Sequence, residues 1–369
     1  MWFFRAPEII FGEDSLDFIS NLAAERVLIV SDKNIASSGS LDHVLKRLGS
    51  SSVKVISDVP VEPDFQFISS FRQQVANFAP DLIIGVGGGS TLDAAKVLFA
   101  QYGAPDINPK EITPILKLDL KNECKLALVP TTTGTGSECS WAAVICDETG
   151  RKNELASHEI MADYAIIDPK MVETLPHDVM RNTAADAITH AVEAYTSAWK
   201  NPFSDAMADK SLELIANNYF VAEHDLTSRH MLQIGASMAG ISFSNSQVGL
   251  AHALGHALGS LYRLPHGICV SIFLPSVTEF NENAVKNRQL DLIGDFPEKY
   301  RKENLSATLR SFFRDMGLPD SAEKAGIDPH EYRRREVDML DLASSSACVI
   351  TNPRQPSNDE ILDIIRSIY

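Results

Sequence analysis

Three histidines stand close together in a segment of the chain that is otherwise mostly apolar or glycine. They are His252, His256 and His266, within GLAHALGHALGSLYRLPHG at residues 249–267. His252 and His256 are four residues apart, so their side chains share a face if the segment is helical. A proline before the third histidine and a glycine after it predict the end of that helix and a turn.

Asp186 and His190 show the same four-residue spacing further upstream, in the helical pattern ADAITHAVEAY. One carboxylate and up to three imidazoles can bind a divalent transition metal, because imidazole suits Fe, Zn, Cu and Ni and the carboxylate adds an oxygen ligand. A single histidine on an apolar helix face is more often a hydrogen-bonded core residue. Burying unpaired polar groups costs on the order of 1–3 kcal/mol each, and a metal satisfies several at once. The spacing therefore favours a metal site, and leaves open which three or four side chains bind.

A glycine-rich turn, GGGS at residues 87–90, connects the strand pattern LIIGV to the helical pattern TLDAAKVLFA. Backbone N–H groups at such a turn can approach a phosphate, and the helix N-terminus favours its negative charge. We expect Ser90 or Thr91 to cap that helix. A tight turn is the alternative, but three consecutive glycines are more than a turn requires. The motif is neither a GxGxxG at the first strand nor a P-loop, and it leaves NAD, a mononucleotide and a sugar phosphate open.

A second hydroxyl-rich turn, PTTTGTGSE at residues 130–138, follows the strand pattern LALVP. Its position at the same edge of the sheet favours contact with a cofactor over an ordinary Thr/Gly loop. Asp32 follows the strand pattern VLIV. A carboxylate there can accept a hydrogen bond from a ribose hydroxyl and repel a 2′-phosphate, which favours NAD over NADP. A helix cap is an equally good interpretation of Asp32.

Short runs rich in β-branched residues alternate with helical patterns in the first half of the chain. The runs lie at residues 27–30, 53–56, 82–86, 126–130 and 164–168. Continuous apolar strands that alternate with helices predict a parallel sheet covered on both faces. Nucleotides bind at the strand ends of open α/β sheets. Residues 2–11 hold two further apolar runs split by a proline, and they predict an edge hairpin.

From about Thr174 onward the pattern is helical, with no convincing strand. At 369 residues the chain is long enough for two domains. We expect an α/β dinucleotide-binding domain with a parallel sheet at residues 1–178 and an all-α metal-binding domain at residues 179–369. The nucleotide signals fall in the first domain and the metal-ligand candidates in the second, so a cleft between the domains is the expected active site.

Composition excludes several classes of partner. The formal net charge of −16 argues against a nucleic-acid partner. No apolar run approaches the roughly 20 residues of a membrane span, and the N-terminus lacks the pattern of a signal peptide. The five cysteines form no CxxC pair, which favours reduced thiols. We therefore expect a cytoplasmic protein that binds neither nucleic acid nor membrane.

Together these motifs resemble the iron-containing, group III alcohol dehydrogenase family. The resemblance runs along nearly the whole chain, and its strongest blocks are GVGGGSTLDAAK, PTTTGTGSE, AIIDP, DAITHAVEAY and HALGHALGSLYRLPHG. It implies a dehydroquinate synthase-like fold with a Rossmann-like N-terminal domain and a helical C-terminal domain. It also implies one divalent metal, Fe2+ or else Zn2+, NAD(P)-dependent interconversion of alcohols with aldehydes or ketones, and a homo-oligomer of at least two chains.

Matched position by position, the resemblance implies roles for single residues. The metal ligands fall on Asp186, His190, His252 and His266. His256 matches a histidine that contacts substrate or relays a proton, and Phe243 matches a residue that lines the substrate pocket. The cofactor positions fall on Asp32, Gly88, Gly89, Ser90, Asp93, Thr131, Thr132, Thr135, Ser140 and Lys152.

A few positions depart from the family pattern. Ala257 and Ala162 stand where proline is common, and Cys139 and Ser140 stand where Val-Thr is commoner. None of these departures removes a metal ligand. They leave the subgroup of the family open, and with it the substrate.

The motifs together with the family resemblance imply a metal-dependent alcohol dehydrogenase or aldehyde reductase that transfers a hydride between NAD(H) and a small alcohol or aldehyde. Glycerol dehydrogenases and dehydroquinate synthases share the two-domain plan but carry fewer histidine ligands, and they are the alternative within the fold. A mononuclear non-haem iron oxygenase fits two histidines and a carboxylate, but it does not fit the nucleotide loops. A non-catalytic NAD-binding or regulatory protein is a third alternative.

Overall fold

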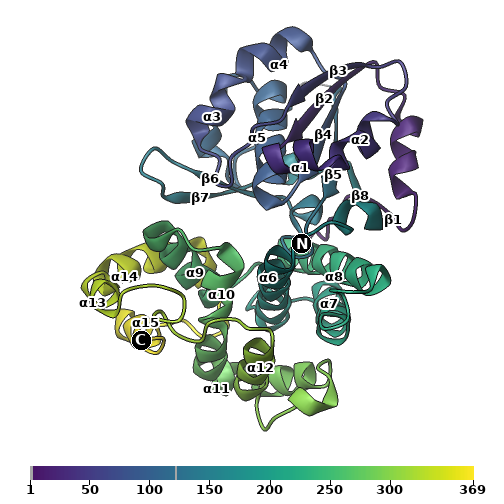
Figure 1. Cartoon of the computed structure of the whole chain (residues 1–369). Helices are drawn as coiled ribbons and strands as arrows, with labels where there is room; N and C mark the ends of the chain where they lie inside the picture. The colour runs from purple at the N-terminus through teal and green to yellow at the C-terminus, as the bar shows by residue number, and fades with distance from the viewer. Residues whose placement is uncertain (1–2, 121–122) are drawn as a thin grey trace. The chain divides into compact units, whose positions relative to one another are not determined.

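The computed structural model describes residues 3–120 and 123–369. The chain forms two compact units, which are coloured from purple to teal and from teal to yellow in Figure 1. One unit is Arg5–Leu175, and the other is Pro176–Tyr369 together with residues 3–4. The first is an α/β unit with a parallel sheet and the second is helical, so the predicted fold class is confirmed.

The sheet of the α/β unit has six parallel strands in the order β1-β8-β5-β4-β2-β3. Its strands are β1 (Glu8–Phe11), β2 (Arg26–Ser31), β3 (Ser52–Ile56), β4 (Leu82–Gly87), β5 (Lys125–Pro130) and β8 (Tyr164–Ile167). Five of them coincide with the predicted apolar runs to within one residue at either end. The central strand β4 is buried along its whole length, as expected for a parallel sheet covered on both faces.

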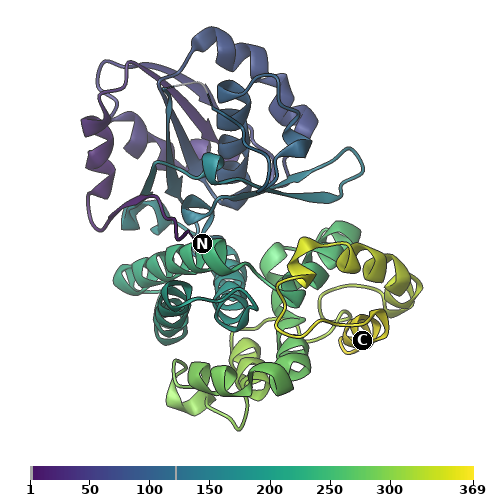
Figure 2. The ribbon, with the colours of Figure 1, turned by 180° about the vertical axis from the view of Figure 1, so that it is seen from behind.

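Alternate residues of β2 point to opposite faces of the sheet, and each face has its own core. Val27 and Ile29 pack with residues of the 3-10 helix Ser15–Leu22 and of α2 (Ser40–Leu45). Leu28 and Val30 pack with residues of α3, α4 and α5 on the other face. The bounds of these three helices are Phe65–Ser70, Arg72–Phe78 and Gly89–Gly103. Figures 1 and 2 show α3, α4 and α5 together on that side of the sheet.

The start of the chain differs from its prediction. The edge hairpin predicted for residues 2–11 is wrong among the residues described there, which exclude residue 2, because β1 pairs with β8 in parallel. The N–H of Glu8 donates to the carbonyl of Asp163 at 3.0 Å. The ring of Phe4 instead lies 5.4 Å from that of Phe203 in the helical unit. Phe4, the last residue of the first apolar run, therefore packs against another ring.

A two-stranded antiparallel sheet in the α/β unit was not predicted. It consists of β6 (Ala142–Cys146) and β7 (Lys152–Ala156), with Ala142 opposite Ala156 and Cys146 opposite Lys152. The two strands are joined by the turn DETGR, in which Gly150 has a φ of 84°. This turn is the sequence signal that could have identified the hairpin.

The helical unit contains no strand, and every residue from 176 to 369 is described. Its α-helices are α6 (His177–Thr196), α7 (Pro202–Asn218), α8 (Leu226–Ser246), α9 (Leu250–Tyr262), α10 (His266–Ser271), α11 (Leu274–Ile293), α12 (Leu305–Asp315), α13 (Pro329–Arg334), α14 (Glu336–Ser344) and α15 (Asn358–Arg366). Several of these helices have a capping side chain at the N-terminus, such as Asn201 at α7 and Ser357 at α15. Among the described residues, no helix combines the length and the apolar character that crossing a bilayer requires.

Candidate metal centre and cofactor loops

Three imidazoles converge on one carboxylate oxygen in the helical unit. The Nε2 atoms of His190 and His252 each lie 3.7 Å from Oδ1 of Asp186, and Nε2 of His266 lies 3.5 Å from the same atom. Asp186, His190 and His252 are all buried, and each offers a ligand atom within 4.8 Å of the others. The side chain of His266 is 32% exposed, which leaves one side of the cluster accessible.

Helices α6, α9 and α10 position this cluster. Asp186 and His190 lie one turn apart on α6, as their spacing predicted, and His252 lies in the first turn of α9. His266 is the first residue of α10, so the chain turns after α9 as predicted. A Cβ atom on Gly267 would lie 1.7 Å from the carbonyl oxygen of Asn182 on α6. Glycine is required there because α10 approaches α6 closely, and that approach brings His266 to Asp186.

The donor set fits a divalent cation. Oδ1 of Asp186 and Nε2 of His252 are buried, and neither has a hydrogen-bond partner among the described residues. Leaving such groups unsatisfied costs about 1–3 kcal/mol each. A metal placed among the four side chains would satisfy both. Three imidazole nitrogens and one carboxylate oxygen suit Fe2+ and Zn2+.

The electrostatics of the cluster favour a positive charge at its centre. Burial raises the pKa of Asp186, but the imidazoles of His190, His266 and His252 more than offset it and hold this pKa below the usual range. Burial alone lowers the pKa of His252, whereas the carboxylates of Asp186 and Glu193 raise it to about 9. Metal binding through Nε2 of His252 requires the neutral ring, because a ligand nitrogen carries no proton.

His256 and Phe243 border the cluster. The ring of His256 lies 5.2 Å from that of His266, with the two planes 24° apart. The ring of Phe243, on α8, is stacked on His190 at 4.4 Å. The first contact places a second titratable imidazole beside His266. The second places an apolar wall beside His190.

Glu193 is a residue at this site that the sequence reasoning missed. Its Oε2 lies 2.6 Å from Nδ1 of His252, and its side chain is 4% exposed. Glu193 follows Asp186 by seven positions and His190 by three, so the three share a face of α6. This DxxxHxxE spacing was the signal that could have included Glu193.

The glycines of the GGGS turn are favoured by close packing and not by backbone conformation. Among residues 87–89, all of which are described, no glycine has a positive φ. A Cβ on Gly87 would lie 2.6 Å from the Cβ of Thr91, and a Cβ on Gly88 would lie 3.2 Å from Cγ2 of Thr132. The turn is therefore packed against the PTTTGTGSE loop, at the carboxyl ends of β4 and β5. Thr131 joins the two loops by donating its N–H to the carbonyl of Gly87 at 3.0 Å.

No side chain caps α5, the helix that follows this turn. The prediction that Ser90 or Thr91 caps it is wrong, because the N-cap residue is Gly88 and both hydroxyls lie within the helix. Ser90 Oγ donates to the carbonyl of Val61. Thr91 Oγ1 donates to Oδ2 of Asp32 at 3.3 Å. The start of a 15-residue helix thus lies beside the glycine turn without a capping side chain.

Asp32 caps α1 (Lys33–Ser38), as one of its two interpretations predicted. Its Oδ1 accepts hydrogen bonds from the N–H groups of Asn34 and Ile35 at 2.9 and 3.1 Å. Its Oδ2 faces Thr91. The carboxylate is therefore held beside the start of α5, where a cofactor ribose could reach it.

Two threonines of the PTTTGTGSE loop lie against the glycine turn. Oγ1 of Thr132 is buried and has no hydrogen-bond partner among the described residues. Thr135 contacts Gly89, since a Cβ there would lie 3.0 Å from Cγ2 of Thr135. An unsatisfied hydroxyl beside a tightly packed glycine turn at the start of a helix fits a phosphate-bearing ligand.

A buried lysine, which the sequence reasoning also missed, connects α5 with the segment that holds Ser137 and Ser140. Lys96 of α5 is fully buried, and its Nζ donates to Ser137 Oγ at 2.9 Å, Ser140 Oγ at 3.0 Å and the Ala142 carbonyl at 2.7 Å. Ser137 in turn donates to Oδ1 of Asp93 at 2.6 Å. The predicted cofactor residues Asp93 and Ser140 therefore belong to one network. The sequence signal that could have identified Lys96 was its charge within the mostly apolar pattern TLDAAKVLFA.

Lys152 is the predicted cofactor residue on the unpredicted strand β7. Its Nζ lies 3.3 Å from Oε1 of Glu62. Glu62 follows Val61, whose carbonyl accepts a hydrogen bond from the hydroxyl of Ser90. Lys152 is thus tied to the segment that borders the glycine turn.

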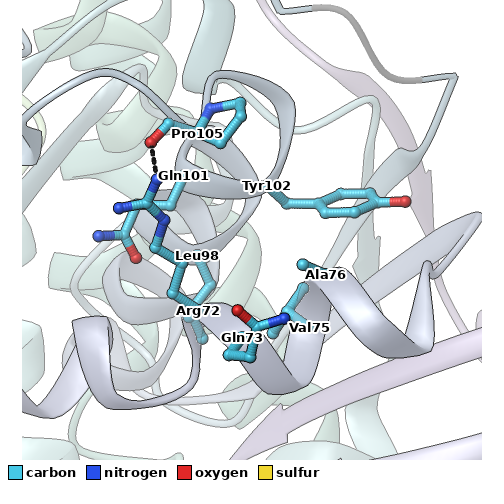
Figure 3. A pocket seen from close by; sticks show the side chains of 8 residues that line it. All are labelled: Arg72, Gln73, Val75, Ala76, Leu98, Gln101, Tyr102 and Pro105. Atoms are coloured by element: carbon cyan, nitrogen blue, oxygen red, sulfur yellow. Dashed lines mark hydrogen bonds between the residues drawn. The ribbon is translucent and has the colours of Figure 1, made fainter.

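A pocket of about 290 Å³ on the α/β unit contains none of the predicted site residues. Figure 3 shows its lining side chains, which come from α4, α5 and the chain after α5. Across its edge, Arg72 donates a hydrogen bond to the carbonyl of Pro105. The pocket lies apart from the glycine turn and holds no cluster of titratable groups, so it is not the candidate site.

Comparison with known proteins gives matches along the whole chain. The family "Iron-containing alcohol dehydrogenase" matches residues 6–169, and the family "Fe-containing alcohol dehydrogenase family, C-terminal" matches residues 180–369. An alcohol dehydrogenase of Thermococcus barophilus is 32% identical, over 100% of this chain and 99% of its own. An NADPH-dependent butanol dehydrogenase of Clostridium saccharobutylicum is 31% identical, over 100% and 98%.

Solved structures give the same result. An iron-containing alcohol dehydrogenase from Thermococcus thioreducens superimposes with a TM-score of 0.90 at 31% identity, over 100% of this chain and 99% of that one. A 1,3-propanediol oxidoreductase superimposes with a TM-score of 0.93 at 26% identity, over 100% of both chains.

Proposed function

The chain belongs to the iron-containing alcohol dehydrogenase family, and we propose that it transfers a hydride between NAD(H) and a small alcohol or aldehyde. Its metal is held by Asp186, His190, His252 and His266. The observation that carries this proposal is the convergence of three imidazole Nε2 atoms on Oδ1 of Asp186. If the histidines had only a structural role, Oδ1 of Asp186 would stay buried without a hydrogen-bond partner. A bound metal satisfies that oxygen.

The metal is Fe2+ in this proposal, and Zn2+ is the alternative, because both accept three nitrogens and one oxygen. When bound, it supplies a Lewis acid for the oxygen of the substrate. Asp186 contributes the only negative charge among the four ligands and so lowers the net charge of the site. His266 lies at the more exposed side of the cluster, where a substrate can enter.

The α/β unit binds the nicotinamide cofactor, which supplies the acceptor or donor of the hydride. The uncapped start of α5 and the hydroxyl of Thr132 receive the pyrophosphate. The carboxylate of Asp32 disfavours a 2′-phosphate, so NAD is preferred over NADP. The relative from Clostridium saccharobutylicum is named as NADPH-dependent. The preference of this chain for NAD over NADP therefore has to be measured.

Two residues beside the metal ligands complete the proposed site. Phe243 presents an apolar ring next to His190 and limits the size of the substrate. His256 takes up the hydroxyl proton of the alcohol at an imidazole nitrogen, because its ring lies beside His266, at the border of the metal cluster. We also propose a homo-oligomer of at least two chains, as the family resemblance implies, and a cytoplasmic location, which the pattern of the cysteines favours.

Oxidation of NADH by chelator-stripped protein tests this function. A panel of short aldehydes is supplied, with Fe2+ added under anaerobic conditions in one series and Zn2+ in another. We expect turnover to be absent without metal and to return with one of the two ions. Absence of turnover with either ion, despite tight NADH binding, would refute the proposal. Oxygen uptake without NADH consumption would favour an oxygenase, and substrate conversion without net NADH change would favour a lyase-type enzyme of the same fold.

A further inference from the structure

We infer that Glu193 is a positioning residue: it holds His252 in the tautomer that can bind the metal, and it fixes the start of α9 against α6. The inference rests on the proposed function only in requiring that His252 is a metal ligand. It assigns a role to a residue outside the proposed ligand set. Glu193 contacts neither metal nor substrate in this assignment and acts through His252.

Helix α6 presents Glu193 on the same face as two of the proposed ligands. Asp186, His190 and Glu193 are spaced by four and three residues, so they form one line along the helix. Glu193 is 4% exposed. A buried carboxylate is costly unless hydrogen bonds satisfy it, so its partners indicate why it is there.

The hydrogen-bond partners of the carboxylate among the described residues lie at the start of α9. Oε2 of Glu193 accepts from the N–H of Gly249 at 2.9 Å, and Oε1 accepts from the N–H of Ala251 at 2.6 Å. The N-cap residue Gly249 has no capping side chain of its own. The first N–H groups of a helix lack partners within the helix, and its N-terminus favours a negative charge. Glu193 therefore supplies from α6 the cap that α9 lacks.

The third partner is the imidazole of His252. Its Nδ1 lies 2.6 Å from Oε2 of Glu193. A carboxylate only accepts hydrogen bonds, so Nδ1 must carry a proton, and the neutral ring then has its lone pair on Nε2. Nε2 is the atom that faces Asp186 at 3.7 Å. A carboxylate that orients a ligating histidine in this way also increases its basicity.

Exchange of Glu193 for glutamine tests this role with little change in size. The amide keeps one acceptor oxygen but replaces the other with an NH2 group. In one orientation this group faces the N–H of Ala251, and in the other it faces both the N–H of Gly249 and Nδ1 of His252. If it faces Nδ1, that atom becomes an acceptor and the proton moves to Nε2, which can then no longer bind a metal. We expect Glu193→Gln to raise the dissociation constant for Zn2+ by about 10–100-fold.

The measurement is a Zn2+ titration of the chelator-stripped full chain in competition with a chromophoric chelator, together with thermal unfolding of the metal-free form. Asn352→Ala is the matched control. Oδ1 of Asn352 accepts from the N–H of Leu250 at 3.4 Å, at the same helix end, and from the side chain of Asn281 at 3.0 Å, whereas Nδ1 of His252 is paired with Glu193. We expect this variant to lower the unfolding temperature and to leave the dissociation constant unchanged.

Two results would overturn the inference. One is a Glu193→Gln variant that binds Zn2+ as tightly as the wild type. The other is an Asn352→Ala variant that loses as much Zn2+ affinity and as much thermal stability as Glu193→Gln does. If Glu193→Gln does not fold, Glu193→Asp replaces it. That variant keeps a carboxylate for the helix end, but its shorter side chain lengthens the contact with Nδ1 of His252. We expect it to bind Zn2+ more weakly than the wild type does, and unchanged affinity also counts against the inference. Failure of the wild-type protein to bind Zn2+ or Fe2+ would instead refute the proposed function.

Discussion

The ammonium nitrogen of Lys96 lies 3.7 Å from Oδ1 of Asp93 in the interior of the α/β unit, and the side chain of Lys96 is fully buried. Burial lowers the pKa of Lys96, and the charge of Asp93 opposes that shift. Burial likewise raises the pKa of Asp93, and Lys96 opposes it. Each charge is thus tolerated in the interior because the other is present. The pair holds α5 to the loop that carries Ser137 and Ser140.

Lys96→Met should destabilise the α/β unit by about 3–5 kcal/mol, because breaking a buried ion pair leaves the other charge uncompensated. The carbonyl of Ala142 also loses its donor. Urea unfolding followed by circular dichroism measures the change. Lys33→Met is the control, since Lys33 is exposed and such substitutions change stability by no more than about 0.5 kcal/mol. Equal stabilities of the two variants would contradict the assignment of Lys96 to the network.

Asp32→Gly should increase the use of NADP relative to NAD. The substitution removes the charge that repels a 2′-phosphate, and glycine in place of an N-cap aspartate weakens the start of α1 by only a few tenths of a kcal/mol. The ratio of kcat/KM for the two cofactors is the readout. Thr91→Val serves for comparison, because it removes the hydrogen bond to Oδ2 and keeps the carboxylate. An unchanged cofactor ratio in Asp32→Gly would exclude Asp32 from cofactor selection.

His190→Ala and His266→Ala should each lose bound metal and activity together, since each removes one of the nitrogens that face Asp186. His256→Ala should keep the metal and lose activity, because His256 is proposed to move a proton and not to bind the metal. Metal content by mass spectrometry, measured beside turnover, separates these two outcomes. A His190→Ala or His266→Ala variant that retains both metal and activity is not missing a ligand.

Asp295→Asn should stabilise the protein in a pH-dependent manner. Burial and the charges of Asp209 and Glu213 raise the pKa of Asp295 to about 7. A carboxyl whose pKa is higher in the folded than in the unfolded state takes up a proton on folding. It therefore lowers stability as pH rises from its unfolded pKa of about 4 to its folded value. The advantage of the variant should grow over that interval and stay constant above pH 7.

Thermal unfolding of wild type and Asp295→Asn between pH 5.5 and pH 8.5 checks this expectation. Asp291→Asn is a suitable comparison, because Asp291 is a carboxyl four residues away, in the last turn of α11, and its loss removes the same formal charge. A constant difference in unfolding temperature across the whole range would show that Asp295 is ionised throughout.

The sequence by itself determined the features that depend on neighbours along the chain. A helix has 3.6 residues per turn, so the spacing of Asp186 and His190 placed both side chains on one face of α6 before any fold was known. The parallel strands could also be predicted from their apolar runs, because a strand buried on both faces needs an uninterrupted apolar sequence. The family resemblance added the ligand set and the cofactor positions as expectations.

Only the tertiary structure decided which distant groups meet. The spacing left His252, His256 and His266 equivalent, and the packing of α9 and α10 on α6 brought the Nε2 atoms of His252 and His266 to Asp186. The contact between Glu193 and His252 spans 59 residues. Lys96 meets Ser140 across 44 residues. Such contacts depend on how helices and loops pack, which the periodicity of a single segment does not contain.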